Sequence, residues 1–105
     1  MDVSVLESFL KGWLKQNPKL SAGAASLTSL ITIVDGVVIF DCIHLWANYQ
    51  MKYIRGGLGT YADGLLNKIR PDIVEFKNQR GVKELKIKWE FRYGETVYST
   101  RQNYY

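Results

Sequence analysis

The chain has 105 residues, of which 47% are hydrophobic and 23% are charged, and its formal net charge is +4. This length corresponds to one domain, and this composition is typical of a globular fold and excludes a largely disordered chain. The single cysteine, Cys42, excludes an intrachain disulfide.

The positive charge is concentrated in the second half of the chain. Residues 1–49 contain three Lys or Arg and four Asp or Glu, a balance of 3 − 4 = −1. Residues 50–105 contain 11 and 6, a balance of 11 − 6 = +5. This asymmetry favours an anionic partner that meets the second half.

The N-terminus and the most apolar stretch both argue against export and membrane insertion. Met1-Asp2-Val3 has no basic region ahead of an apolar stretch, which disfavours a signal peptide. Residues 24–47 are the most apolar part, but Asp35 and Asp41 fall within it, and each carboxylate near a bilayer centre would cost about 3 kcal/mol. We therefore predict a cytoplasmic protein without membrane contact.

The first predicted element is a helix that ends at Asn17-Pro18. Apolar residues recur at three- and four-residue steps from Val3 to Leu14, which is the spacing of one helical face. Ser4 with Glu7 fits a capping box, and Asp2 is the alternative cap. Proline disfavours the α conformation in the residue before it, so the helix stops there.

The second predicted element is a β-hairpin with Asp35-Gly36 as its two-residue turn. The flanking runs, 30–34 and 37–40, are rich in β-branched residues. Both faces of this hairpin are apolar, whereas one layer of helices covers only one face of a sheet. We therefore predict self-association, with a homodimer favoured, through a face formed by Ile31, Ile33, Val38 and Phe40.

Residues 43–55 fit two alternative patterns, and a second helix is predicted after them. Residues 43–55 fit either a strand that continues to about His44 or a short helix. A clear helix is predicted from Thr60, with Gly81 as its stop. Pro71 removes a helical donor, so the helix is expected to kink or split there.

A second hairpin is predicted at the C-terminal end of the sequence. Its first arm alternates apolar and charged side chains from Leu85 to Tyr93, which is the pattern of a half-buried strand. Gly94-Glu95 supplies a two-residue loop, with glycine where a type II′ turn needs a positive φ. The resulting register places Lys88 opposite Arg101.

The solvent-facing side of this hairpin is the best candidate site in the sequence. Like charges directly opposite each other destabilise a ladder, so either solvent screens Lys88 and Arg101 or an anionic partner uses them. Tyrosines nearby can stack on bases or fill a protein interface, and an open strand edge invites pairing with another chain. The predicted nucleic-acid or partner contacts are Lys86, Lys88, Arg92, Arg101, Tyr98, Tyr104 and Tyr105.

The sequence offers no convincing catalytic or metal-binding pattern. Cys42 and His44 would lie about 7 Å apart on a strand, which is too far for a thiolate–imidazole pair, and two such ligands cannot close a zinc site. The glycine-rich stretch after Arg55 matches neither of the phosphate-loop patterns. We predict no enzyme, no metal and no cofactor.

Together these elements predict one α+β domain over residues 1–105, an antiparallel sheet of two hairpins packed with two helices in the order α-β-β-α-β-β. This order is similar to that of profilin-like and roadblock-like modules, which form dimeric scaffolds, and of NTF2-like folds, which enclose a pocket. The leading functional prediction is a non-enzymatic module that self-associates and acts as an adaptor, an inhibitor or a structural subunit. The alternatives are a nucleic-acid-binding protein that uses the basic second half, and a ligand pocket or enzyme lined by Trp46, Trp89 and His44.

Overall fold

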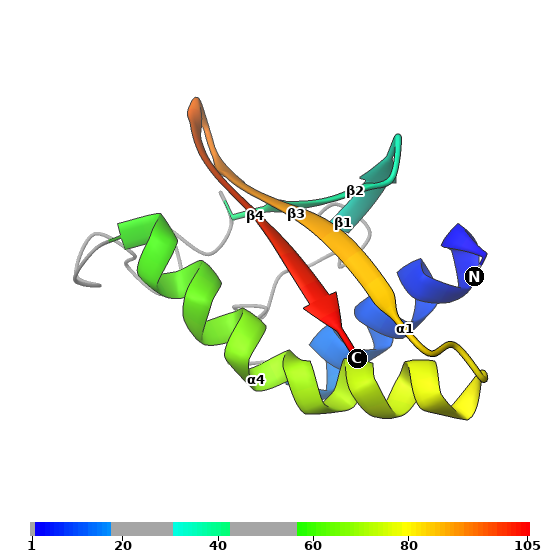
Figure 1. The fold of residues 1–105 in the computed structure, drawn as a ribbon. Coiled ribbons are helices and arrows are strands. Elements are labelled where there is room, and N and C mark those ends of the chain that lie inside the picture. The colour runs from blue at the N-terminus through cyan, green and yellow to red at the C-terminus, as the bar shows by residue number, and fades with distance from the viewer. Residues whose placement is uncertain (1, 18–30, 43–56) are drawn as a thin grey trace.

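The computed structural model describes residues 2–17, 31–42 and 57–105, which form two helices and a four-stranded sheet (Figure 1). The helices are α1 (Val3–Gln16) and α4 (Gly57–Gln79). The strands are β1 (Ile31–Val34), β2 (Val37–Asp41), β3 (Leu85–Tyr93) and β4 (Thr96–Tyr104). The predicted α+β class and the element order α-β-β-α-β-β are confirmed.

The four strands lie side by side in chain order, β1-β2-β3-β4. Both hairpins have the predicted registers, with Val34 paired to Val37 and Lys88 paired to Arg101. The two hairpins join in parallel, however, with Phe40 beside Phe91, so the sheet is mixed and only its hairpins are antiparallel. The cause is the connection between β2 and β3, because a crossover that contains a helix returns the chain in the same direction.

The hairpin turns have the backbone conformations that their residues favour. Asp35 and Gly36 have φ values of 52° and 77°, and a type I′ turn requires positive φ at both positions. Gly94 has a φ of 58°, as the first central position of a type II′ turn requires. These tight turns fix both registers and therefore decide which side chains share a face.

Helix α1 is capped by Asp2, the alternative that the sequence left open. The Ser4 backbone N–H donates to Asp2 Oδ1 at 3.0 Å. At the other end the backbone N–H of Asn17 donates to the carbonyl of Leu14 at 3.0 Å. The helix therefore ends at Gln16, with Asn17 as its cap, just ahead of Pro18 as predicted.

Helix α4 is longer than predicted, and Pro71 neither ends nor splits it. It begins at Gly57 instead of Thr60. Ile69 and Ile73 on either side of Pro71 are both buried against the sheet, and this packing holds the helix together despite the missing donor. Among the described residues, no helix is both long enough and apolar enough to cross a membrane.

The C-terminal end of α4 is a Schellman motif built on Gly81. The Val82 N–H donates to the Lys77 carbonyl at 3.0 Å, and the Gly81 N–H donates to the Asn78 carbonyl at 3.1 Å, with Gly81 at φ 70°. The buried Lys77 ammonium donates to Asn78 Oδ1 at 2.8 Å and to the Lys83 carbonyl at 3.1 Å. Gly81 is thus the stop that the sequence predicts.

Both helices pack on the same side of the sheet, called here the inner face (Figure 1). The four side chains predicted to mediate self-association lie on this inner face. Ile31, Val38 and Phe40 are at most 2% exposed, and Ile33 is half-buried against them. The fold of one chain therefore covers them, because α1 and α4 occupy the side on which a second copy would have to dock.

Candidate functional site

The opposite side of the sheet, called here the outer face, is not covered by either helix (Figure 1). Alternation along β3 sends Ile87, Trp89 and Phe91 into the core and directs Lys86 and Lys88 outward. Strand β4 alternates in register with β3. The outward side chains of the β3–β4 hairpin are Lys86, Lys88, Glu90, Arg92, Val97, Ser99, Arg101 and Asn103.

Lys88 and Arg101 form the centre of this outer face. They are Cα partners across the β3–β4 ladder, and both side chains are exposed. A two-residue hairpin loop makes Tyr93 and Thr96 a hydrogen-bonded pair, so alternation makes Lys88 and Arg101 a non-hydrogen-bonded pair. Side chains approach most closely in such pairs, with Cα atoms about 4.5 Å apart.

The electrostatic surroundings of this pair leave its charge uncompensated. Arg92 Nε lies 3.2 Å from Glu90 Oε1, and Lys86 Nζ lies 3.7 Å from Glu84 Oε1. Within the described part of the chain, neither Lys88 nor Arg101 forms an ion pair. The acids of the outer face are thus paired around these two cations rather than with them.

A shallow hollow lies beside the Lys88–Arg101 pair. Its volume is about 460 Å³, and it is lined by Gly36, Lys86, Ile87, Lys88, Arg101 and Asn103. Gly36 reaches it because Val37, the next residue, pairs with Lys88 across β2 and β3. Three cationic side chains, an amide and a glycine backbone around one hollow are suited to a phosphate or carboxylate.

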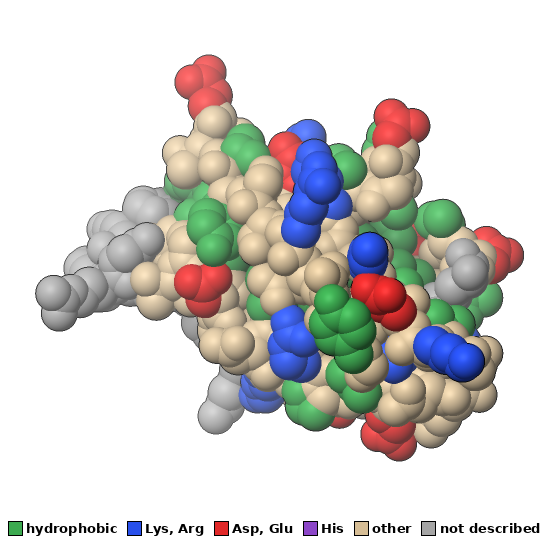
Figure 2. Space-filling view, viewed as in Figure 1, with side chains coloured by type: hydrophobic (Ala, Val, Ile, Leu, Met, Phe, Trp, Pro, Cys, Tyr) green, Lys and Arg blue, Asp and Glu red, His purple; other side chains and the backbone are tan. Residues whose placement is uncertain are grey.

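The outer face as a whole has an alternating arrangement of charge. Figure 1 shows the sheet curving between the two hairpin tips, and Figure 2 shows Asp or Glu side chains at those tips with Lys and Arg side chains between them. The tips are the turns at Asp35-Gly36 and Gly94-Glu95. A bound anion would therefore be attracted to the middle of the face and repelled at its two ends.

The predicted tyrosine contacts divide between the two faces. Tyr104 is fully buried, and its hydroxyl accepts a hydrogen bond from Trp89 Nε1 at 3.1 Å. Tyr98 points inward and donates to Asp63 Oδ1 of α4 at 2.9 Å, and this hydrogen bond raises the pKa of Tyr98. Only Tyr105 of the three is free to meet a partner, with 72% of its surface exposed.

Tyr105 lies next to the basic hollow. Asn103 Nδ2, whose residue lines the hollow, donates to Tyr105 Oη at 3.2 Å. The tyrosine ring therefore lies within reach of anything bound over Lys88 and Arg101. Of the predicted set, Lys86, Lys88 and Arg101 line the hollow and Tyr105 lies beside it, while Arg92 is on the same face but outside the hollow and paired with Glu90.

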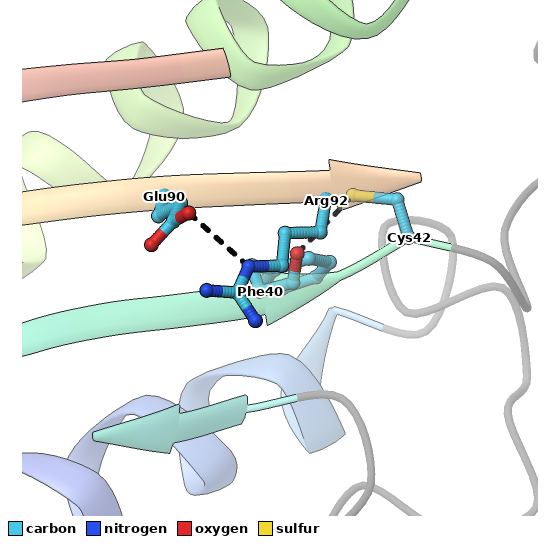
Figure 3. A network of polar contacts seen from close by, with 4 residues as sticks. All are labelled: Phe40, Cys42, Glu90 and Arg92. Carbon is cyan, nitrogen blue, oxygen red and sulfur yellow. Dashed lines mark hydrogen bonds and ion pairs between the residues drawn. The ribbon is translucent and has the colours of Figure 1, made fainter. Parts of the chain in front are cut away.

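Cys42 is a buried thiol at the end of β2. Its Sγ lies 3.7 Å from the carbonyl oxygen of Phe40, and its N–H donates to the Arg92 carbonyl at 2.7 Å. Figure 3 shows the thiol beside β3, with the Glu90–Arg92 pair on the same strand. Burial first, and the charge of Asp41 second, raise the pKa of Cys42 from 9.0 to about 12, so the thiol is not a nucleophile at neutral pH.

A second hollow, which the sequence did not indicate, lies between α1 and α4. Its volume is about 740 Å³, and stacked rings of Phe9 and Phe76, with centroids 4.2 Å apart, form part of its lining. Trp13 Nε1 donates to Asp72 Oδ2 at 2.6 Å, and the Arg80 guanidinium lies 3.9 Å above the Phe76 ring. The Trp13–Asp72 hydrogen bond thus joins the two helices, while Arg80 contacts the end of its own helix.

The remaining sequence hypotheses involve few described residues. His44, Trp46 and Arg55 lie outside the described residues, and Trp89 is 1% exposed in the core. Among the residues that the structure describes, no group of three or more His, Cys, Asp or Glu is arranged to hold a metal ion. Comparison with protein-family models, curated proteins and solved structures finds no match for this chain.

Proposed function

We propose that this protein binds single-stranded nucleic acid, and that it does so with the outer face of β3 and β4. The observation that carries the proposal is the exposed pair Lys88 and Arg101, which face each other without an acidic partner in the described chain. Such a pair weakens the folded protein unless something anionic neutralises it. A phosphate backbone supplies that charge, and Lys86 and Asn103 extend the same hollow.

The contact chemistry favours phosphate recognition over base recognition. Lys and Arg on a sheet face bind phosphates without regard to base identity, so the interaction is expected to be tolerant of sequence. The exposed ring of Tyr105 adds one stacking surface beside the hollow. A base that stacks on one aromatic ring contributes about 1–3 kcal/mol.

A single strand fits the distribution of charge better than a duplex does. Asp35 and Glu95 lie in the turns of the two hairpins, which stand at the two ends of the basic region. A rigid duplex that reached across both tips would bring its phosphates against these carboxylates, whereas a flexible strand can lie between them. Stacking on Tyr105 also requires an unpaired base.

The test is fluorescence anisotropy with a labelled single-stranded oligonucleotide and a labelled duplex of equal length. We expect tighter binding to the single strand, and weaker binding to both as salt rises from about 50 mM to about 200 mM, because phosphate contacts release counterions. Absence of binding to either probe at the lower salt concentration would exclude this function. A preference for the duplex would exclude the single-strand assignment.

A further inference from the structure

Strand β4 forms one edge of the sheet, and the hairpin geometry determines which of its backbone groups face outward. Tyr93 and Thr96 flank the two-residue loop as a hydrogen-bonded pair, so Tyr98, Thr100, Gln102 and Tyr104 bond to β3. The alternate residues, Val97, Ser99, Arg101 and Asn103, direct their N–H and C=O groups away from β3. The Arg92 carbonyl agrees with this alternation, because it bonds to Cys42 on the β2 side.

Helix α4 supplies a hydrogen-bond partner to the outward backbone groups of this edge at one end only. Arg70 Nη1 donates to the outward carbonyl of Asn103 at 3.0 Å, while Arg70 also contacts Gln102 Oε1 and lies over the Tyr104 ring at 4.6 Å. In the described chain, the outward groups of Val97, Ser99 and Arg101 have no hydrogen-bond partner. Figure 1 shows β4 running from the hairpin tip down toward α4, where the chain ends.

The free part of the edge lacks most of the features that normally block strand pairing. Strand β4 is nine residues long, contains no proline, and has regular one-to-one pairing with β3 throughout. Protein edges are usually protected by proline, bulges, charged side chains or a covering element, and of these the free part of β4 has only the charged side chain of Arg101. Val97, at 48% exposure, adds an apolar side chain to this edge.

We propose that β4 pairs antiparallel with β4 of a second copy of this chain, with Ser99 of each copy at the two-fold axis. This interface goes beyond the binding function proposed above, because it uses the backbone edge of β4 rather than the outer face, although Arg101 belongs to both. It joins the outward groups of Ser99 in the two copies, and those of Val97 in one copy with those of Arg101 in the other. The two sheets become one continuous sheet, and both outer faces lie on the same side.

Charge complementarity supports this register and a second copy of the chain as the partner. With Ser99 at the axis, Arg101 lies directly opposite Val97 of the second copy and diagonal to its Glu95, which gives an attractive cross-strand pair. A register centred on Arg101 would place two guanidinium groups directly opposite each other. The chosen register covers Val97 and leaves the Asn103 carbonyl, which Arg70 occupies, outside the paired region.

The test is light scattering with in-line chromatography on the full chain, from about 1 µM to about 500 µM, a range that detects micromolar dissociation constants. We expect the mass to rise with concentration toward twice the 12.1 kDa of one chain. Ser99→Lys and Ser99→Glu should each remain monomeric, because like charges meet at the axis. An equimolar mixture of the two variants should again form dimers, because the opposite charges then meet.

Two outcomes would overturn the proposal. One is a wild-type mass of 12.1 kDa at every concentration. The other is a dimer that both Ser99 charge variants retain, since that dimer would use another surface. Ser99→Thr is the matched control and should dimerise like the wild type, and circular dichroism of each variant establishes that the monomeric variants are folded.

Discussion

Lys88 and Arg101 are direct cross-strand neighbours on the outer face of the sheet, and both are exposed. They occupy the type of pair in which antiparallel strands bring side chains closest together. The nearby acids, Glu84 and Glu90, form ion pairs with Lys86 and Arg92. The concentration of positive charge at this point is therefore a property of the fold as well as of the sequence.

Reversing the charge of Lys88 should weaken binding to a single-stranded oligonucleotide. Lys88→Glu removes one phosphate contact and adds a repulsive one, so we expect the Kd to rise at least about tenfold, which corresponds to about 1.4 kcal/mol. Lys68→Glu is the matched control, because Lys68 is exposed on α4 and the change in net charge is the same. Equal losses for the two variants, measured by anisotropy, would show that net charge alone controls binding.

Neutralising Lys88 should make the free protein more stable. Lys88→Gln removes the repulsion from Arg101, and the free energy of unfolding should rise by about 0.5 kcal/mol at low salt. The gain should shrink as salt screens the wild-type pair. Lys86→Gln is the control, since Lys86 pairs with the uncharged Asn103 and gains nothing comparable. Urea unfolding of the three proteins at two salt concentrations measures the effect, and a less stable Lys88→Gln would contradict it.

Removing the Tyr104 hydroxyl should destabilise the core. Tyr104→Phe keeps the ring but leaves the buried Trp89 indole N–H without its acceptor, at a cost of about 1–3 kcal/mol. Burial also raises the pKa of Tyr104 above 10.0, so the wild type loses stability above pH 10, where the unfolded tyrosine ionises first. The phenylalanine variant lacks this loss. The stability difference measured by denaturant unfolding should therefore narrow above pH 10, and a widening gap would contradict the prediction.

The Cys42 thiol should be unreactive in the folded protein. It is 0% exposed, and its pKa is raised from 9.0 to about 12 chiefly by burial. The folded state therefore loses stability as pH rises from about 9 to about 12, because the unfolded thiol ionises first. A chromogenic disulfide reagent at pH 8 should label the native chain only at its unfolding rate, and label the chain in denaturant at once. Rapid labelling of the native chain would show that the thiol is accessible.

The elements that short-range patterns determine could be predicted from the sequence. Asp35-Gly36 and Gly94-Glu95 specify tight turns, and the turns fix the register of each hairpin. The alternation of β3 then places Lys88 on the outer face and Trp89 in the core. The central pair of the candidate site follows from these local rules.

The arrangement of the two hairpins could not be predicted in the same way. The parallel pairing of Phe40 with Phe91 depends on the crossover through α4, which connects residues far apart in the sequence. Both faces of the first hairpin are apolar, so the sequence could not indicate which face the helices cover. In the structure the helices cover the face that carries Ile31, Val38 and Phe40. The opposite face of this hairpin, which is at least partly exposed, carries Thr32, Val34, Val37 and Ile39.

The roles of Tyr98 and Tyr104 also could not be predicted from the sequence. A run of tyrosines near basic residues predicts stacking surfaces, yet Tyr104 supports Trp89 and Tyr98 bonds to Asp63 of α4. Their inward direction follows from the β3–β4 register. The hydrogen bond from Tyr98 to Asp63 joins residues that are far apart in the sequence, so no local pattern predicts it.

The most direct test of the proposed function is the salt dependence of single-strand binding for the wild type and for the double variant Lys88→Gln, Arg101→Gln. Each phosphate contact contributes about −0.7 to the slope of log K against log salt for a single strand. We predict a wild-type slope near −3 if Lys86, Lys88, Arg92 and Arg101 all engage phosphates, and a slope shallower by about 1.4 for the double variant. Equal slopes for the two proteins would contradict the account, because they would place the phosphate contacts on another part of the chain.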